Sequence, residues 1–198
     1  MEERFEELID GYAQNGVGVS RHFLPQDLAM SLRQNLESLY LNGQTVLAGV
    51  GDANNRVVAT AIRRDKIFWI EPDTTNISEL QFIAIVEDFV AHLNATCYTG
   101  INAYEFHYAV YEEGSYYKRH KDQFKTNSAR KFSFVIYLNE NWEECNGGQL
   151  VLYSNNGVEQ SELPTNRKAV FFRSDDLEHE VLPVNKKRLS IVGWLKSV

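Results

Sequence analysis

Apolar residues recur at helical spacing in three segments of the first half of the chain, residues 2–13, 25–41 and 76–93. An amphipathic helix that turns one face to a core shows this spacing. Pro25 suits the first turn of the second helix, and Asn76 or Ser78 supplies the N-cap of the third. The pattern therefore predicts three helices ahead of the rest of the fold.

The second half of the chain changes to short runs of strand character that are separated by turn residues. About eight such runs follow Cys97, at residues 103–110, 115–118, 131–138, 149–152, 157–162, 169–172, 178–183 and 189–195. Two earlier strands are predicted at residues 17–19 and 64–70. Helices followed by a run of strands predict an α+β, mainly β fold: a double-stranded β-helix (a cupin-like jelly roll) flanked by N-terminal helices.

Residues 47–62 differ from their surroundings, because they carry Gly49, Gly51 and Asn54-Asn55 with weak periodicity. We expect a mobile loop here, with a short strand at residues 57–60. A chain of this length fits one domain, residues 1–198. Within it, residues 1–97 provide helical support and the loop, and residues 98–198 form the jelly-roll core.

Composition narrows the class of protein. The formal net charge is −7, which argues against general electrostatic binding of nucleic acid. A local basic patch could still come from Arg63-Arg64, Arg119-His120-Lys121 or Lys186-Lys187-Arg188. Two cysteines are too few for a disulfide framework, so a reducing cytoplasm is expected. The charged N-terminal segment resembles neither a signal peptide nor a membrane span.

An imidazole and a carboxylate stand two positions apart at His120 and Asp122, and His179 can complete a cluster. Residues i and i+2 of an extended strand face the same side. Two histidines and one carboxylate form the facial triad that leaves coordination positions open on non-haem Fe(II). Taken alone, the His120-x-Asp122 pair also fits a solvated charged turn, and His179 also fits a half-buried strand histidine that bonds a neighbour.

Arg188 adds an independent observation, because it lies on an apolar C-terminal strand where an unpaired guanidinium would be costly. A turn at residues 183–185 would return this strand beside the one that carries His179. A guanidinium can bind a carboxylate through two parallel hydrogen bonds. The triad and Arg188 together predict an iron pocket that accepts a carboxylate-bearing co-substrate.

Several stretches of the chain resemble a known family. They are residues 111–122 (Tyr-Glu-Glu-Gly-Ser-Tyr-Tyr-Lys-Arg-His-Lys-Asp), residues 130–150, and residues 171–194, which end in Arg-Leu-Ser-Ile-Val-Gly-Trp. Together they resemble the Fe(II)/2-oxoglutarate-dependent prolyl hydroxylases, in particular the oxygen-sensing PHD/EGLN type and its bacterial relatives. Residues 62–71 extend the resemblance into a segment that the wider oxygenase superfamily does not share.

The resemblance implies roles for individual positions. His120, Asp122 and His179 would bind the iron. Arg188 would pair with the distal carboxylate of 2-oxoglutarate, to which Tyr137 would donate a hydrogen bond. The other implied positions line the co-substrate pocket (Tyr111, Val135, Leu150 and Val192) or face the substrate proline (Tyr117, Arg130 and Trp194). Residues 47–62 would form a lid over the proline.

The activity implied by the resemblance is that of a 2-oxoglutarate-dependent dioxygenase, similar to the peptidyl-proline and procollagen-proline 4-dioxygenases. It would use Fe(II), 2-oxoglutarate and O2, with ascorbate as a stimulant, and would release succinate and CO2. The implied substrate is a prolyl residue in a protein or peptide, and a translation elongation factor is a candidate by resemblance only. We expect a cytoplasmic monomer that binds neither nucleic acid nor membranes.

Three other functions stay open at this point. The same chemistry could act on a free amino acid or small metabolite. A nucleic-acid demethylase of the same superfamily is a second candidate, against which the acidic balance speaks. The third is a non-catalytic, metal-binding jelly roll that acts as a sensor or interaction module.

Two features lie outside these roles. Strand alternation places His107 on the same face as Tyr111, so His107 is either a pocket residue or a core histidine, at a position where the family usually carries an apolar residue. Arg63 and Asp65 fit a structural salt bridge with or near Arg130, or equally an exposed charge cluster.

Overall fold

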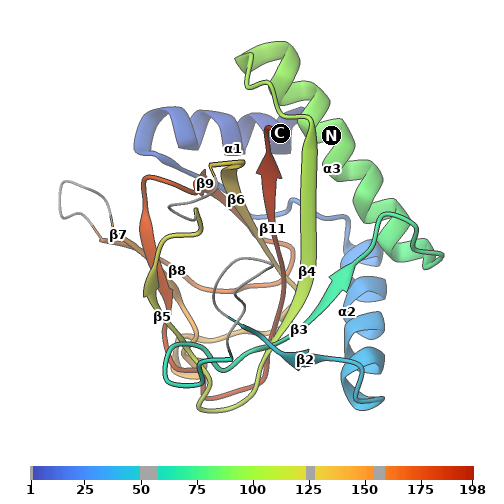
Figure 1. The fold of residues 1–198 in the computed structure, drawn as a ribbon, viewed down its shortest axis with the longest axis vertical. Coiled ribbons are helices and arrows are strands. Elements are labelled where there is room, and N and C mark those ends of the chain that lie inside the picture. Colours follow the sequence, from blue (N-terminus) through green and yellow to red (C-terminus); the bar gives the residue numbers. More distant parts are fainter. Residues whose placement is uncertain (1, 50–57, 124–127, 154–158) are drawn as a thin grey trace.

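The computed structural model describes residues 2–49, 58–123, 128–153 and 159–198 (Figure 1). Its helices are α1 (Glu2–Asn15), α2 (Gln26–Leu41) and α3 (Ile77–Cys97). The predicted helices are confirmed, although α3 continues beyond the end that its sequence pattern indicated. Among the described residues, no helix has the length and apolar character that crossing a bilayer requires.

The ends of α2 and α3 follow from local sequence. Pro25 occupies the N-cap of α2, one position before the helix and not in its first turn. Asn76 caps α3, because its side chain accepts hydrogen bonds from the backbone N–H groups of Ser78 and Glu79. Of the two predicted caps, Asn76 is therefore the one that the helix uses.

The strands follow the predicted order along the chain. They are β1 (Val17–Ser20), β2 (Val46–Leu47), β3 (Lys66–Ile70), β4 (Ala103–Tyr111), β5 (Tyr117–His120), β6 (Arg130–Tyr137), β7 (Leu150–Tyr153), β8 (Glu159–Glu162), β9 (Ala169–Arg173), β10 (Glu178–Val181) and β11 (Arg188–Lys196). A short 3-10 helix, η1 (Glu144–Asn146), precedes β7. The predicted run of strands after Cys97 is confirmed as β4 to β11.

The strands form two antiparallel sheets. The larger has the order β1-β9-β6-β11-β4-β3-β2, and the smaller has the order β5-β10-β7-β8. Side chains from both sheets meet in one apolar cluster, which includes Val135 of the larger sheet and Leu152 of the smaller. Non-consecutive neighbours in two facing antiparallel sheets are the arrangement of a jelly roll. The predicted fold class is therefore confirmed.

Alternation along the strands divides the larger sheet into two faces. On β4, Phe106, Tyr108 and Val110 join the core beneath the helices, whereas Ala109 and Tyr111 point toward the smaller sheet. Figure 1 shows α2 and α3 on one side of the larger sheet, α1 across its upper end, and β5, β7 and β8 on the side opposite α2 and α3. The face toward the smaller sheet is the face that carries the chemistry described below.

The segment predicted as a loop at residues 47–62 differs from expectation where the structure describes it. Leu47 belongs to β2, which pairs with β3, and this strand was not predicted. The predicted strand at residues 57–60 is wrong for residues 58–60, which form a coil and turn, and Val57 lies outside the described residues. The predicted lid cannot be placed, because residues 50–57 lie outside the described residues as well.

Candidate metal centre

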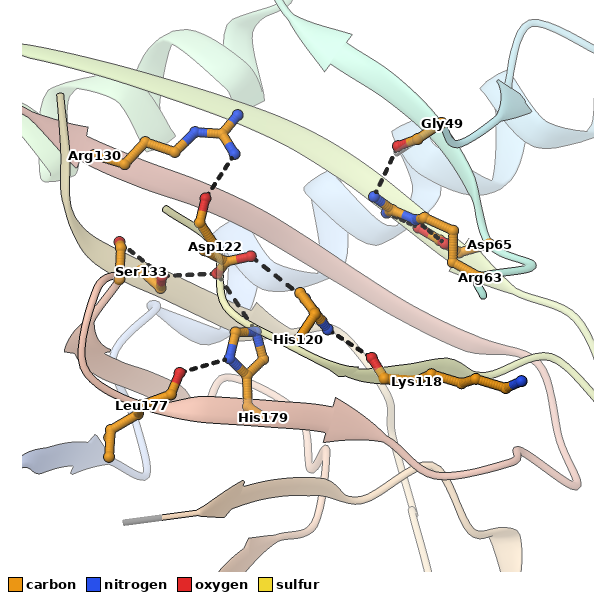
Figure 2. A network of polar contacts seen from close by, with 11 residues as sticks. Gly49, Arg63, Asp65, Lys118, His120, Asp122, Arg130, Ser133, Leu177 and His179 are labelled. Carbon is orange, nitrogen blue, oxygen red and sulfur yellow. Dashed lines mark hydrogen bonds and ion pairs between the residues drawn. The ribbon is translucent and has the colours of Figure 1, made fainter. Parts of the chain in front are cut away.

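The triad predicted from sequence comes together between β5 and β10. His179 lies directly opposite His120 in the strand register. The Nε2 atoms of His120 and His179 each lie 3.4 Å from a carboxylate oxygen of Asp122, Oδ1 and Oδ2 respectively (Figure 2). One ligand atom from each residue lies within 4.8 Å of the others, which is a suitable spacing for a shared metal ion.

His120 and Asp122 do not converge because they alternate along one strand, as the sequence analysis predicted. β5 ends at His120, so Asp122 lies in the bend beyond the strand and does not alternate with it. The bend is held by two backbone contacts. Gln123 N–H donates to the Ser174 carbonyl, and the Arg130 guanidinium donates to the Asp122 carbonyl. These contacts carry the Asp122 side chain back toward the two imidazoles.

Both imidazoles are oriented by the backbone. His120 Nδ1 lies 2.7 Å from the Lys118 carbonyl, and His179 Nδ1 lies 3.4 Å from the Leu177 carbonyl (Figure 2). A carbonyl only accepts a hydrogen bond, so in each ring Nδ1 carries the proton and Nε2 keeps its lone pair. Metal-binding histidines are commonly fixed in this way. Burial also lowers the pKa of His179 to about 4, so this ring is neutral near physiological pH.

Asp122 is held as a carboxylate. Burial alone would raise the pKa of its side chain, but the two neighbouring imidazoles and a hydrogen bond from Ser133 lower the pKa well below its usual range. Ser133 Oγ donates to Oδ2 at 2.7 Å and lies 2.9 Å from Ser174 Oγ. Sequence reasoning missed Ser133, although its alternation with Val135 on β6 places it on the pocket face.

A column of stacked groups lies beside His120. The ring of Tyr117 stacks on the His120 imidazole at 3.5 Å, and the Arg63 guanidinium lies 4.2 Å from the centroid of the Tyr117 ring. Arg63 pairs with the fully buried Asp65 at 2.6 Å. The predicted salt bridge between Arg63 and Asp65 is confirmed, and the alternative of an exposed charge cluster is wrong. Both residues also line the pocket, which the sequence did not indicate.

Arg188 lies at the other end of the pocket and is 1% exposed. Its guanidinium lies 4.8 Å from the centroid of the Tyr111 ring and 5.0 Å from that of Tyr137, and it donates to Ser190 Oγ. Among the described residues, no Asp or Glu pairs with it, and its Nε has no hydrogen-bond partner. Within the described residues, the hydroxyl of Tyr137 is likewise buried without a hydrogen-bond partner. Burial raises its pKa against the opposing effect of the Arg188 charge, so it remains a donor.

The predicted site residues largely converge on one pocket. Those that line it are Tyr111, Tyr117, His120, Asp122, Val135, Leu150, His179, Arg188, Val192 and Trp194. Tyr137 and Arg130 are not among the lining residues. The lining also includes His107 and Val181, of which the first was an open alternative and the second was not predicted.

Arg130 has a different partner from the one expected. It pairs with Glu105 at 2.8 Å, and Lys196 pairs with the same carboxylate at 3.1 Å. No ion pair joins Arg130 to Asp65 within the described part of the chain, so the prediction that Arg130 shares the Arg63 and Asp65 salt bridge is wrong; its partner is Glu105 on β4. The Arg130 guanidinium lies 3.5 Å from the Trp194 ring centroid, which places these two side chains together near Asp122.

A larger hollow, of about 920 Å³, lies elsewhere in the molecule between β1 and β8. The metal-binding group found among the described residues is the triad alone, and the walls of this hollow contribute nothing to it. The smaller pocket is therefore the chemically organised one. Its donor set, two imidazole nitrogens and a carboxylate oxygen, fits Fe(II), and its unpaired guanidinium fits a carboxylate on a second ligand.

Comparison with known proteins agrees with this geometry. The sequence model of the 2OG-Fe(II) oxygenase superfamily matches residues 106–196. The chain is 31% identical to a prolyl-4-hydroxylase from Pseudomonas putida, covering 98% of this chain and 99% of that one, with a TM-score of 0.88. It is 26% identical to a Trichoplax adhaerens prolyl hydroxylase solved with a peptide fragment of the hypoxia inducible factor oxygen degradation domain, covering 99% and 90% of the chains, with a TM-score of 0.87.

Proposed function

Because the chain belongs to the 2-oxoglutarate–Fe(II) oxygenase superfamily, we propose that it hydroxylates a prolyl residue in a protein or peptide. It is a 2-oxoglutarate-dependent dioxygenase, and its family implies Fe(II), 2-oxoglutarate and O2. The observation that carries the proposal is the buried Arg188, whose charge has no carboxylate partner among the described residues, in the same pocket as the triad. A co-substrate with a free carboxylate would supply that partner.

His120, Asp122 and His179 would hold the iron through two Nε2 atoms and one carboxylate oxygen. When bound, Fe(II) supplies the redox chemistry that couples decarboxylation of 2-oxoglutarate to succinate and CO2 with hydroxylation of a C–H bond. The protein contributes a fixed donor set, because backbone carbonyls orient both imidazoles and Ser133 orients the carboxylate. These contacts keep the donors in place before any metal arrives.

Arg188 and Tyr137 would anchor the distal carboxylate of 2-oxoglutarate. The guanidinium offers paired N–H donors, and the Tyr137 hydroxyl adds an O–H donor. Tyr111 lies opposite Arg188 in the strand register and would close the pocket on that side. The apolar side chains of Val135, Leu150 and Val192 would exclude water from the rest of the co-substrate. Exclusion of water strengthens the charge pairing at Arg188.

The proline would enter over Tyr117, Trp194 and Arg130. Tyr117 stacks on His120 and Trp194 lines the same pocket, so two aromatic rings lie next to the metal donors. Arg130 covers the Trp194 ring and would keep it in place. Support for a polypeptide substrate comes from the Trichoplax adhaerens relative, which was solved with a peptide fragment. A translation elongation factor remains our candidate for the protein that carries the proline.

The remaining expectations form part of the same proposal. We propose a single domain over residues 1–198, a monomer, a cytoplasmic location and stimulation by ascorbate. Both cysteines, Cys97 and Cys145, are free and exposed, which supports a reducing compartment. Ascorbate would act by keeping the iron reduced.

The proposal is tested by mass spectrometry of host-lysate proteins after incubation with the wild-type enzyme, Fe(II), 2-oxoglutarate and ascorbate. We expect one protein to gain one oxygen atom on a proline, with release of succinate. The His120→Ala variant is the matched control and should leave that protein unmodified. His179→Ala should abolish iron-dependent 2-oxoglutarate turnover. Succinate release without any protein gaining oxygen on proline would favour a small-molecule substrate, and full turnover by His179→Ala would refute the triad assignment.

A further inference from the structure

His107 is a buried imidazole in the pocket wall to which the proposed chemistry assigns no role. It lies on β4 and is 2% exposed. In the strand register it stands between Trp69 of β3 and Val192 of β11. Its ring centroid lies 5.0 Å from that of Trp69, edge to face, and 5.6 Å from that of Trp194. The imidazole is thus held among three apolar side chains beside the triad.

The hydrogen-bond partner of His107 fixes the position of its proton. Nδ1 lies 3.0 Å from the backbone carbonyl of Tyr108, which can only accept, so Nδ1 carries the hydrogen. Burial lowers the pKa of the ring to about 4, with the charge of Arg63 as a second cause. The ring is therefore neutral near physiological pH, and its Nε2 holds a lone pair. His107 presents the pocket with a hydrogen-bond acceptor and with no donor.

This acceptor is not used within the described part of the chain. Among the described residues, the ring makes one hydrogen bond, through Nδ1, and none through Nε2. The side chain is 2% exposed, and an apolar residue could pack between the two tryptophans without leaving an acceptor unused. Trp194 Nε1 is a buried donor that likewise has no partner there. The wall of the pocket therefore offers one free acceptor and one free donor from adjacent rings.

The unused acceptor favours ligands that carry a hydrogen-bond donor and disfavours ligands that carry a negative charge at this position. A lone pair attracts an N–H or O–H group and repels a carboxylate. In a polypeptide, the carbonyl of a prolyl residue is followed by the N–H of the next residue. In free proline, the same position carries a carboxylate. A site that needs a donor at this position would accept the first and reject the second.

We propose that His107 is a specificity-determining residue, whose Nε2 accepts a hydrogen bond from the backbone N–H that follows the target proline. The inference rests on the proposed function and narrows it to proline within a polypeptide. The acceptor complements the Trp194 donor, because a peptide group offers both N–H and C=O. Methionine at this position would fill the space without an acceptor, whereas glutamine would supply an amide oxygen.

The test uses three small probes that differ only after the proline: N-acetyl-L-proline N-methylamide, its N,N-dimethylamide, and N-acetyl-L-proline itself. Binding is measured by ligand-observed NMR on protein loaded with Zn(II) and 2-oxoglutarate, so that no turnover occurs. We expect the wild type to bind the methylamide about tenfold more tightly than the dimethylamide, the value of one hydrogen bond, and to bind the carboxylate most weakly. Long-range proton–nitrogen spectra should show His107 Nε2 as the unprotonated ring nitrogen.

Three variants complete the test. His107→Met should bind the two amides equally, His107→Gln should restore the preference, and the exposed His22→Met should keep the wild-type ratio. Thermal unfolding of each variant shows that it is folded. A tenfold preference that survives in His107→Met would overturn the assignment. A wild type that binds all probes equally, or none of them, but still hydroxylates a lysate protein would overturn it and leave the proposed function standing. A wild type that neither binds a probe nor hydroxylates a lysate protein would overturn both.

Discussion

Replacing Arg188 with methionine removes a buried charge and keeps most of the side-chain length. A buried charge without a partner costs several kcal/mol. The contacts of the Arg188 guanidinium with the Tyr111 and Tyr137 rings and with Ser190 offset part of this cost. We therefore expect the ligand-free Arg188→Met variant to be as stable as the wild type or more stable, by up to about 3 kcal/mol.

Ligand binding should change in the opposite sense. At a 2-oxoglutarate concentration of about 100 times Kd, a wild type loaded with Zn(II) gains about 2.7 kcal/mol, which corresponds to a rise in Tm of roughly 5–10 °C. Arg188→Met should lose this rise, because the distal carboxylate no longer has a cationic partner.

The assay is differential scanning fluorimetry with and without 2-oxoglutarate, and the exposed Arg119→Met serves as the control that keeps the shift. If Arg188→Met unfolded well below the wild type without ligand, the charge of Arg188 would be compensated inside the protein and this reasoning would be wrong.

Further predictions concern residues that support the pocket. Gly148→Ala should destabilise the protein by about 1–2 kcal/mol, because φ at this position is +68°; urea unfolding measures the loss. The same change should weaken 2-oxoglutarate binding, because the new Cβ would lie 3.0 Å from Arg188 Cδ; fluorimetry with 2-oxoglutarate measures this effect. Ser133→Ala should weaken Zn(II) binding by about tenfold in calorimetry, because Asp122 loses its hydrogen bond. The free energy of unfolding of the metal-free protein should fall as pH drops from about 6.5 to about 4, because His107 binds a proton in the unfolded state and stays neutral in the folded state. His107→Met should remove up to roughly 3 kcal/mol of this pH dependence. An unchanged pH dependence of stability in urea titrations would contradict the prediction.

Much of the site could be predicted because it depends on residue types that tolerate few alternatives. A guanidinium on an apolar strand requires a partner, so Arg188 indicated a ligand before its surroundings were known. The triad was found for a reason that was only partly correct, because Asp122 lies in a bend and not on a strand. The bend depends on contacts with Ser174 and Arg130, which are distant in sequence and carry no local pattern.

Partner choice among charged residues was the least predictable feature. Arg130 was expected near Arg63 and Asp65, yet it pairs with Glu105. Opposite charges that are far apart in sequence cannot be matched until the strand register is known, since a shift of one residue turns a side chain to the other face. The register that places Trp194 opposite Glu105 decides the pairing.

The distribution of unsatisfied polar atoms supports the view that this pocket is built for ligands. Buried polar atoms in folded proteins are almost always hydrogen-bonded. Among the described residues, five side-chain atoms are buried without a partner, and three of them are Tyr137 Oη, Arg188 Nε and Trp194 Nε1. All three are donors on the pocket face of β6 and β11. Unpaired donors beside a metal-binding triad are costly unless a molecule with several acceptors occupies the site. A carboxylate of 2-oxoglutarate would accept from Tyr137 and Arg188, and a peptide carbonyl of the substrate would accept from Trp194.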